Sequence, residues 1–86
     1  IADGLRSGLG VRNFALIQRF VDTIVTVSEE AIIEAMRLQW TRMKTVVERS
    51  GAVSFAAVLE HNERFRGRRA AIVISGGNVD IDRLPW

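Results

Sequence analysis

An uninterrupted apolar run at Ala70–Ile74 constrains this chain more than any other feature of its sequence. Such a run, closed by Gly76 and Gly77, is typical of a strand buried on both faces in a parallel sheet. The only other segment of strand length is the β-branched run Thr23–Val27. Because two strands cannot form a sheet with both faces covered, the 86 residues are predicted to be one incomplete domain, part of a larger one.

Helical periodicity precedes the first of these two segments and fills much of the sequence between them. The spacing of apolar residues predicts three helices, Asn13–Val21, Ser28–Met43 and Gly51–His61. Ser28 is suited to cap the second helix, and two glutamates follow it, which favours a helix N-terminus. Met36 and Trp40 lie on one face of that helix and are expected in the core. The alternation of helices and strands indicates an α/β fold with parallel pairing.

Composition excludes several classes of site. The absence of cysteine removes disulfides, thiol nucleophiles and cysteine-based zinc sites. The one histidine, His61, is predicted near a helix C-terminus and is assigned no catalysis, and no metal site is predicted. No apolar run approaches the roughly 18 residues of a membrane-spanning helix, and no signal peptide is visible. We therefore expect a cytoplasmic protein without a membrane partner.

The arginines at 64, 66, 68 and 69 surround Phe65 and form the densest basic cluster of the chain. Such a cluster could bind nucleic acid. The cluster is short, however, lies in a predicted connection and belongs to a chain whose net charge is only +2. We interpret it as a solvated loop and expect no nucleic-acid partner.

Polar residues follow the buried strand directly, in the segment Ser75–Asp80. Ligands of open α/β sheets lie beyond the carboxyl ends of strands, where glycine allows close approach of the backbone. The segment therefore predicts either a ligand site, with Ser75 and Asn78 as polar contacts, or a tight turn. Glu48 beside an apolar stretch is either a site carboxylate or a helix-capping one. Asp3 before a glycine is typical of a turn.

Five sequence blocks together resemble one enzyme family. They are Ile1–Gly4, Val21–Glu30, Trp40–Lys44, Glu48–Gly51 and Ser75–Asp80. In this order and spacing they resemble the C-terminal third of the fold-type II pyridoxal-phosphate enzymes, in the branch of serine racemase, threo-3-hydroxyaspartate dehydratase and serine/threonine dehydratase. The resemblance implies a tryptophan-synthase-β-like parallel-sheet domain that binds pyridoxal 5'-phosphate.

The resemblance also implies roles for single residues. Ser75 matches the serine that hydrogen-bonds the pyridine nitrogen of the cofactor, and Gly76 follows it in the cofactor-binding block. A hydroxyl, unlike a carboxylate, does not keep that nitrogen protonated, so the ring is a weaker electron sink, which suits β-elimination. Glu48 matches a glutamate that lines the cofactor pocket, and Asp3 an aspartate of the pocket region.

Four further positions either match an effector site of the family or depart from the family pattern. Lys44 and Asn78 match residues of the ATP effector site in the racemases that respond to nucleotides. Arg12 stands where some relatives have an asparagine near a divalent-cation site, so that cation site is not carried over to this chain. Arg49 stands where proline is usual in the block after Glu48, which predicts an altered turn there.

The resemblance identifies the chain as the C-terminal segment of a dehydratase or racemase for serine, threonine or 3-hydroxyaspartate. The family's Schiff-base lysine lies upstream, so the segment is expected to be inactive without the N-terminal part of the same enzyme. The family also implies a homodimer. An alternative is a free-standing, non-catalytic module that pairs with a separate partner or a paralogue.

Overall fold

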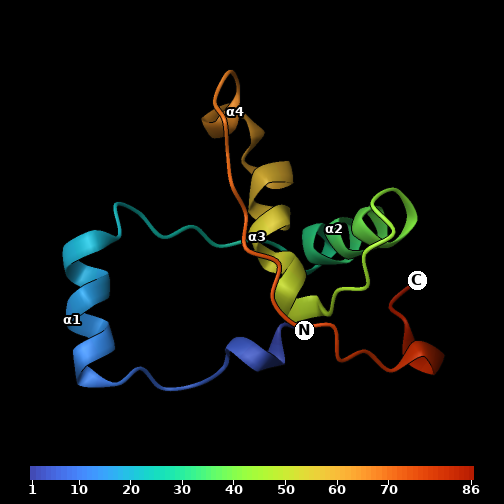
Figure 1. The fold of residues 1–86 in the computed structure, drawn as a ribbon, viewed down its shortest axis with the longest axis horizontal. Helices are drawn as coiled ribbons and strands as arrows, with labels where there is room; N and C mark the ends of the chain where they lie inside the picture. The colour runs from blue at the N-terminus through green and yellow to red at the C-terminus, as the bar shows by residue number, and fades with distance from the viewer.

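The computed structural model describes residues 1–86 and contains only helices and extended segments. In chain order its helical elements are η1 (Asp3–Leu5), α1 (Val11–Phe20), α2 (Glu29–Thr41), α3 (Arg49–Glu60), α4 (Asn62–Phe65) and η2 (Ile81–Arg83). Helices α2 and α3 pack against each other and form the body of the molecule, and α4 extends beyond the end of α3 (Figure 1).

Helix α2 begins where the sequence predicts it. The Ser28 hydroxyl accepts a hydrogen bond from the Ala31 N–H at 3.2 Å, which confirms Ser28 as the N-cap. The helix ends at Thr41, two residues before the predicted end, and Lys44 then adopts a left-handed conformation with φ 55°. The Thr45 N–H bonds back to the carbonyl of Gln39 at 3.0 Å, which satisfies one of the free carbonyls at the helix end.

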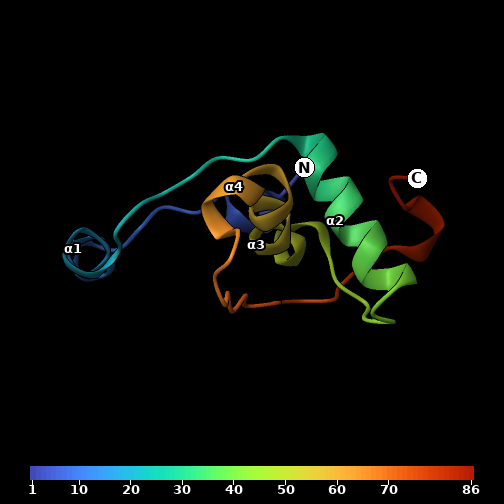
Figure 2. The same cartoon turned by 90° about the horizontal axis from the view of Figure 1, so that it is seen from above.

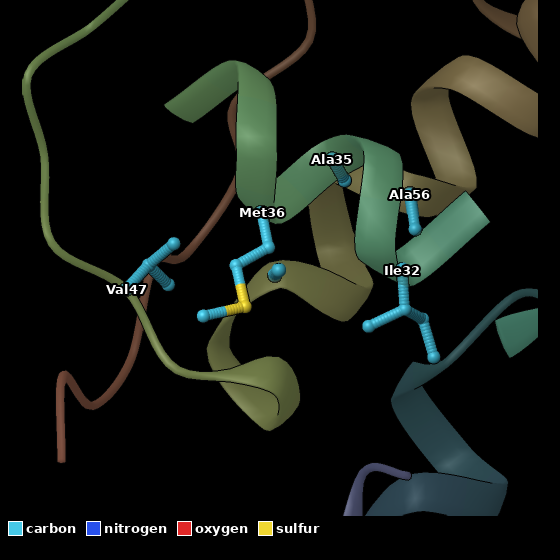
Figure 3. Packing of buried hydrophobic residues seen from close by; sticks show 6 residues of the cluster. Ile32, Ala35, Met36, Val47 and Ala56 are labelled. Carbon is cyan, nitrogen blue, oxygen red and sulfur yellow. The ribbon is translucent and has the colours of Figure 1, made fainter. Parts of the chain in front are cut away.

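Small residues of α3 allow the two helices to approach closely. Ala52 and Ala56 of α3 are fully buried and meet Ile32, Ala35 and Met36 of α2 (Figure 3). The α2 residues recur three and four positions apart and so form one continuous apolar face. Met36 is fully buried, as the sequence predicts, and Trp40, packed on the rim of this core, donates from its indole nitrogen to the Val47 carbonyl at 2.9 Å.

Helix α3 begins two residues earlier than the predicted Gly51–His61 and ends at Glu60, one residue earlier. Glu48 occupies its N-cap position, although the Glu48 side chain makes no capping hydrogen bond. His61 follows the last helical residue, near the helix end as predicted, and its Nε2 lies 2.8 Å from the Thr26 carbonyl oxygen. This contact holds the extended segment before α2 against the end of α3.

The two predicted strands, Thr23–Val27 and Ala70–Ile74, form no sheet in this structure. A strand is defined by ladder hydrogen bonds, and neither segment has a partner strand within the 86 residues. Both segments show the two-residue alternation of a strand. In the second, Ile72 and Ile74 are half-buried, whereas Val73 between them is 79% exposed. One face of each extended segment thus packs against the rest of the chain, and the other face is exposed.

Helix α1 lies apart from the rest of the molecule. It contacts no other helix, and two extended connections join it to the body (Figure 2). It begins at Val11 and ends at Phe20, so the predicted cap at Asn13 is wrong: Gly10 occupies the N-cap position. Most of its apolar side chains, among them Phe14, are exposed.

The region of the arginine cluster is partly helical. The short helix α4 contains Arg64, and Gly67 with φ 74° then reverses the chain into the extended segment that returns along α3. All four arginines are exposed, as a solvated connection predicts. No helix of the chain has both the length and the apolar character that crossing a membrane requires.

Candidate functional site

The segment after Ile74 is held by the N-terminus of α3. The Glu48 N–H donates to the Gly76 carbonyl at 3.2 Å, and the Glu48 carboxylate accepts from the Asn78 N–H at 3.2 Å. Gly76 has φ 73°, and a side chain there would overlap the Glu48 carboxylate. The structure therefore brings three of the predicted site residues, Glu48, Gly76 and Asn78, into direct contact.

Gly51 is the reason that this segment can lie so close to α3. A Cβ atom at this position would overlap the Ser75 carbonyl oxygen and approach the Val47 side chain to 2.8 Å. Any other residue at position 51 would push Ser75 away from the helix. The Ser54 hydroxyl adds a hydrogen bond to the Val73 carbonyl at 2.8 Å, and Ser75 itself is exposed. Helix α3 thus fixes the backbone that presents the Ser75 hydroxyl.

The first residues of the chain meet the same end of α3. The Gly4 N–H donates to the Ser50 hydroxyl at 3.1 Å and to the Asp3 carboxylate at 3.0 Å. Asp3 begins η1, the short turn that the sequence predicts for this region. The two loops that carry Asp3 and Asn78 therefore both contact the N-terminus of α3.

A polar cavity of about 210 Å³ lies between these segments. It is lined by Asp3, Glu48, Arg49, Ser50, Asn78, Val79, Asp80 and Arg83. Three predicted site residues therefore share one cavity, although they are up to 75 positions apart in the sequence. Ser75 and Gly76 do not line it, but Gly76 touches Glu48, which does. Glu48 thus borders both the cavity and the Ser75–Gly76 segment.

Lys44 is separate from this cavity. It lies in the loop after α2, and its Nζ donates to the Thr41 carbonyl at 2.7 Å. It does not line the cavity that Asn78 lines. Within these 86 residues the structure therefore does not bring the two nucleotide-effector candidates together in one cavity.

Sequence reasoning misses the contribution of Gly51, Arg49 and Arg83. The sequence pattern makes Gly51 only the start of a helix, and the one signal of its role is that it is the last residue of the block Glu48–Gly51. Arg49 stands out only as a departure from the family pattern, and nothing in the sequence points to Arg83. The structure places the Arg49 guanidinium 3.2 Å from the Arg83 carbonyl oxygen. No three His, Cys, Asp or Glu side chains gather as a metal site.

Comparison with known proteins identifies the class to which this arrangement belongs. The family model described as pyridoxal-phosphate dependent enzyme matches residues 1–76. Because this match spans most of the chain, the chain belongs to the family of pyridoxal-phosphate dependent enzymes. The family resemblance drawn from the five sequence blocks is thereby confirmed.

Within this family the chain is similar to dehydratases, deaminases and racemases of hydroxy amino acids. The chain is 40% identical to the beta-hydroxyaspartate dehydratase of Paracoccus denitrificans over all of its length, and 46% identical to the serine racemase of Schizosaccharomyces pombe over 96% of it. Among solved structures it superposes on 29% of a threonine deaminase from T.th. with a TM-score of 0.86, at 52% identity over 93% of the chain. It also superposes on 27% of the Dictyostelium discoideum serine racemase, with a TM-score of 0.85, at 41% identity over 94% of the chain.

The chain spans only about a quarter of the length of these relatives, 27% of the dehydratase and 26% of the Schizosaccharomyces pombe racemase. The structural neighbours are fold-type II pyridoxal-phosphate enzymes, so the chain has the conformation of one part of that fold. The strand ladders of that fold are not formed within this chain alone.

The residues present fit one edge of pyridoxal phosphate. The exposed Ser75 hydroxyl can donate to a ring nitrogen, and the glycines at 76 and 77 leave the backbone beside it free of side chains. The only lysine of the chain, Lys44, has its Nζ bonded to the Thr41 carbonyl. These residues suit the nitrogen side of the ring and do not include a lysine to hold its aldehyde carbon.

Proposed function

We propose that these residues are the C-terminal segment of a pyridoxal-phosphate dependent dehydratase or racemase acting on serine, threonine or 3-hydroxyaspartate. The main support for this proposal is the way the N-terminus of α3 holds the segment after Ile74. Ser75 lies against Gly51, and Gly76 lies against Glu48. The relatives named hydroxyaspartate dehydratase, serine racemase and threonine deaminase support the substrate class.

In this proposal Ser75 donates a hydrogen bond to the pyridine nitrogen of the cofactor, which acts as an electron sink when bound. A neutral hydroxyl leaves that nitrogen unprotonated, so negative charge at the substrate α-carbon is stabilised less than it would be beside a carboxylate. Loss of a β-hydroxyl as the α-proton leaves avoids accumulating that charge. Glu48 lines the pocket, held in place by the Asn78 N–H, and Asp3 lines the same cavity.

The open faces of the extended segments support a larger domain around this one. Only eight of the 86 residues are buried, and Ile24 is 77% and Val73 is 79% exposed. Large apolar side chains exposed to this extent are typical of surfaces that another part of the protein covers. We infer that Thr23–Val27 and Ala70–Ile74 become strands of a parallel sheet completed by the N-terminal part of the enzyme. Assembly as a homodimer stays a prediction.

The substitution Ser75→Asp in the full-length enzyme tests the proposal. A carboxylate beside the pyridine nitrogen keeps it protonated, so we expect elimination to fall strongly while the cofactor absorbance of the purified protein is retained. Ser7→Asp, in the exposed loop before α1, is the matched control for an added charge. Unchanged turnover of serine, threonine and 3-hydroxyaspartate in the Ser75→Asp enzyme would remove Ser75 from the pyridine contact.

A further inference from the structure

Arg49 is the charged side chain of the cavity that lacks a partner of opposite charge. Its guanidinium makes one hydrogen bond, to the Arg83 carbonyl at 3.2 Å, and forms no ion pair with any carboxylate. The other charged groups are engaged. Each of the three carboxylates in the cavity accepts a hydrogen bond from a backbone N–H, and Arg83 forms an ion pair with Asp80 at 3.7 Å. Most of the five N–H donors of Arg49 therefore remain free.

The position of Arg49 does not stabilise the helix that carries it. Arg49 is the first residue of α3, and a cation in the first turn of a helix is opposed by the positive end of the helix dipole. The residue is also half-buried, so water screens its charge only in part. A half-buried guanidinium without an ion-pair partner is complementary to a planar anion, which it can bind through two parallel hydrogen bonds.

The other residues of the cavity select the kind of anion. Asp3, Glu48 and Asp80 repel any negative ligand, and they repel a multiply charged phosphate more than a singly charged carboxylate. Ser50 and Asn78 provide neutral polar groups in the same cavity. The volume of about 210 Å³ accommodates a side chain of a few heavy atoms. The cavity therefore fits a carboxylate group better than the phosphate chain of a nucleotide.

Arg49 directly follows Glu48, the residue that also touches Gly76. We propose that Arg49 binds the second carboxylate of a dicarboxylic hydroxy amino acid, so that the enzyme prefers substrates of the 3-hydroxyaspartate type to serine or threonine. This inference rests on the proposed function, because it assigns a substrate class to the same site. Arg49 is in this view a specificity residue, and it takes no part in proton transfer.

The test compares full-length enzyme carrying Arg49→Met with the unmodified enzyme. Removing a charge-assisted hydrogen bond lowers substrate discrimination, and we expect the ratio of kcat/KM for 3-hydroxyaspartate to kcat/KM for L-serine to fall about tenfold to a hundredfold. The affinity for malonate, a dicarboxylate without an amino group, is measured by calorimetry and falls by a similar factor. Arg66→Met, at an exposed arginine in the turn after α4, is the matched control and leaves both quantities unchanged.

Arg49→Lys keeps the positive charge but lacks the planar guanidinium that forms two parallel hydrogen bonds. We expect it to retain only part of the preference for 3-hydroxyaspartate over L-serine, so it tests the proposal if Arg49→Met does not fold. An unchanged substrate ratio together with unchanged malonate affinity overturns the proposal. A loss of ATP affinity in place of malonate affinity overturns the carboxylate assignment. If the unmodified enzyme turns over none of L-serine, L-threonine and 3-hydroxyaspartate, the proposed function fails. The malonate titration then still decides the role of Arg49, supporting it if Arg49→Met abolishes binding and overturning it if binding is retained.

Discussion

The buried side chain of Gln39 lowers the stability of this protein, and a substitution there tests by how much. Gln39 lies seven residues after Ile32 on the buried face of α2 and is fully buried. Neither its Nε2 nor its Oε1 has a hydrogen-bond partner. A buried polar group without a partner costs about 1–3 kcal/mol relative to its hydrated state. The substitution Gln39→Met keeps the length and the unbranched shape of the side chain and removes both polar atoms.

We therefore expect Gln39→Met to raise the free energy of unfolding by about 1–3 kcal/mol. Each kcal/mol shifts Tm by about 2–4 °C in a protein of 150–250 residues and by less in a longer one. The assay is thermal unfolding of the full-length protein, followed by calorimetry, and the expected result is a rise of a few degrees. Gln39→Glu is the companion variant, and we expect a lower Tm because it buries a charge in the same space.

A fall in Tm for Gln39→Met would refute this reasoning. It would mean that the amide is hydrogen-bonded in the intact protein, by an ordered water or by another part of the enzyme, and that the substitution removes a satisfied contact. Gln39→Ala separates packing from polarity, because it removes the polar atoms and leaves a cavity as well. We expect it to be less stable than Gln39→Met by about 2–5 kcal/mol, the range for truncating a buried methionine.

Two further predictions concern helix α3. Gly51→Ala places a methyl group against the Ser75 carbonyl, and we expect a loss of about 1–3 kcal/mol together with weaker cofactor binding, measured by thermal unfolding and cofactor titration; unchanged cofactor affinity would contradict the close approach. Hydrogen bonds from the Ser28 side chain and then from its backbone N–H lower the pKa of Glu60, so its contribution to stability is present above the ordinary carboxyl pKa and is lost as pH falls through the lowered one. We expect Glu60→Gln to flatten the Tm-against-pH curve below the ordinary carboxyl pKa of 4.5, and a curve of unchanged shape would exclude the contact.

The helices could be predicted from the sequence because their signals are local. The periodic face of α2 and the Ser28 cap lie within a few residues of each other, so the helix begins and ends close to where they indicate. The sequence places the N-cap of helix α1 at Asn13, three residues too late, because asparagine is a favourable cap residue. The structure instead has Gly10, which has no side chain to signal a cap, at that position.

The strands and part of the candidate site depend on contacts that a local pattern does not contain. The segment Ala70–Ile74 has a strand sequence and strand alternation, but a ladder requires a neighbour that these residues do not supply. The meeting of Glu48 with Gly76 is suggested only by the family resemblance. The place of Arg83 beside Arg49 follows from the tertiary packing of the C-terminal segment on α3, which no sequence signal indicates.

The pairing of α2 with α3 has a consequence for the order in which the molecule folds. The contacts between these two helices join residues that are close in the sequence, across a loop of only a few positions. Local contacts of this kind form quickly, whereas strand pairing between distant segments is slow because a long loop must close first. We expect the helical hairpin to form early and to hold Ser75 near its final position. Formation of the rest of the sheet is then the slow step that precedes binding of the cofactor.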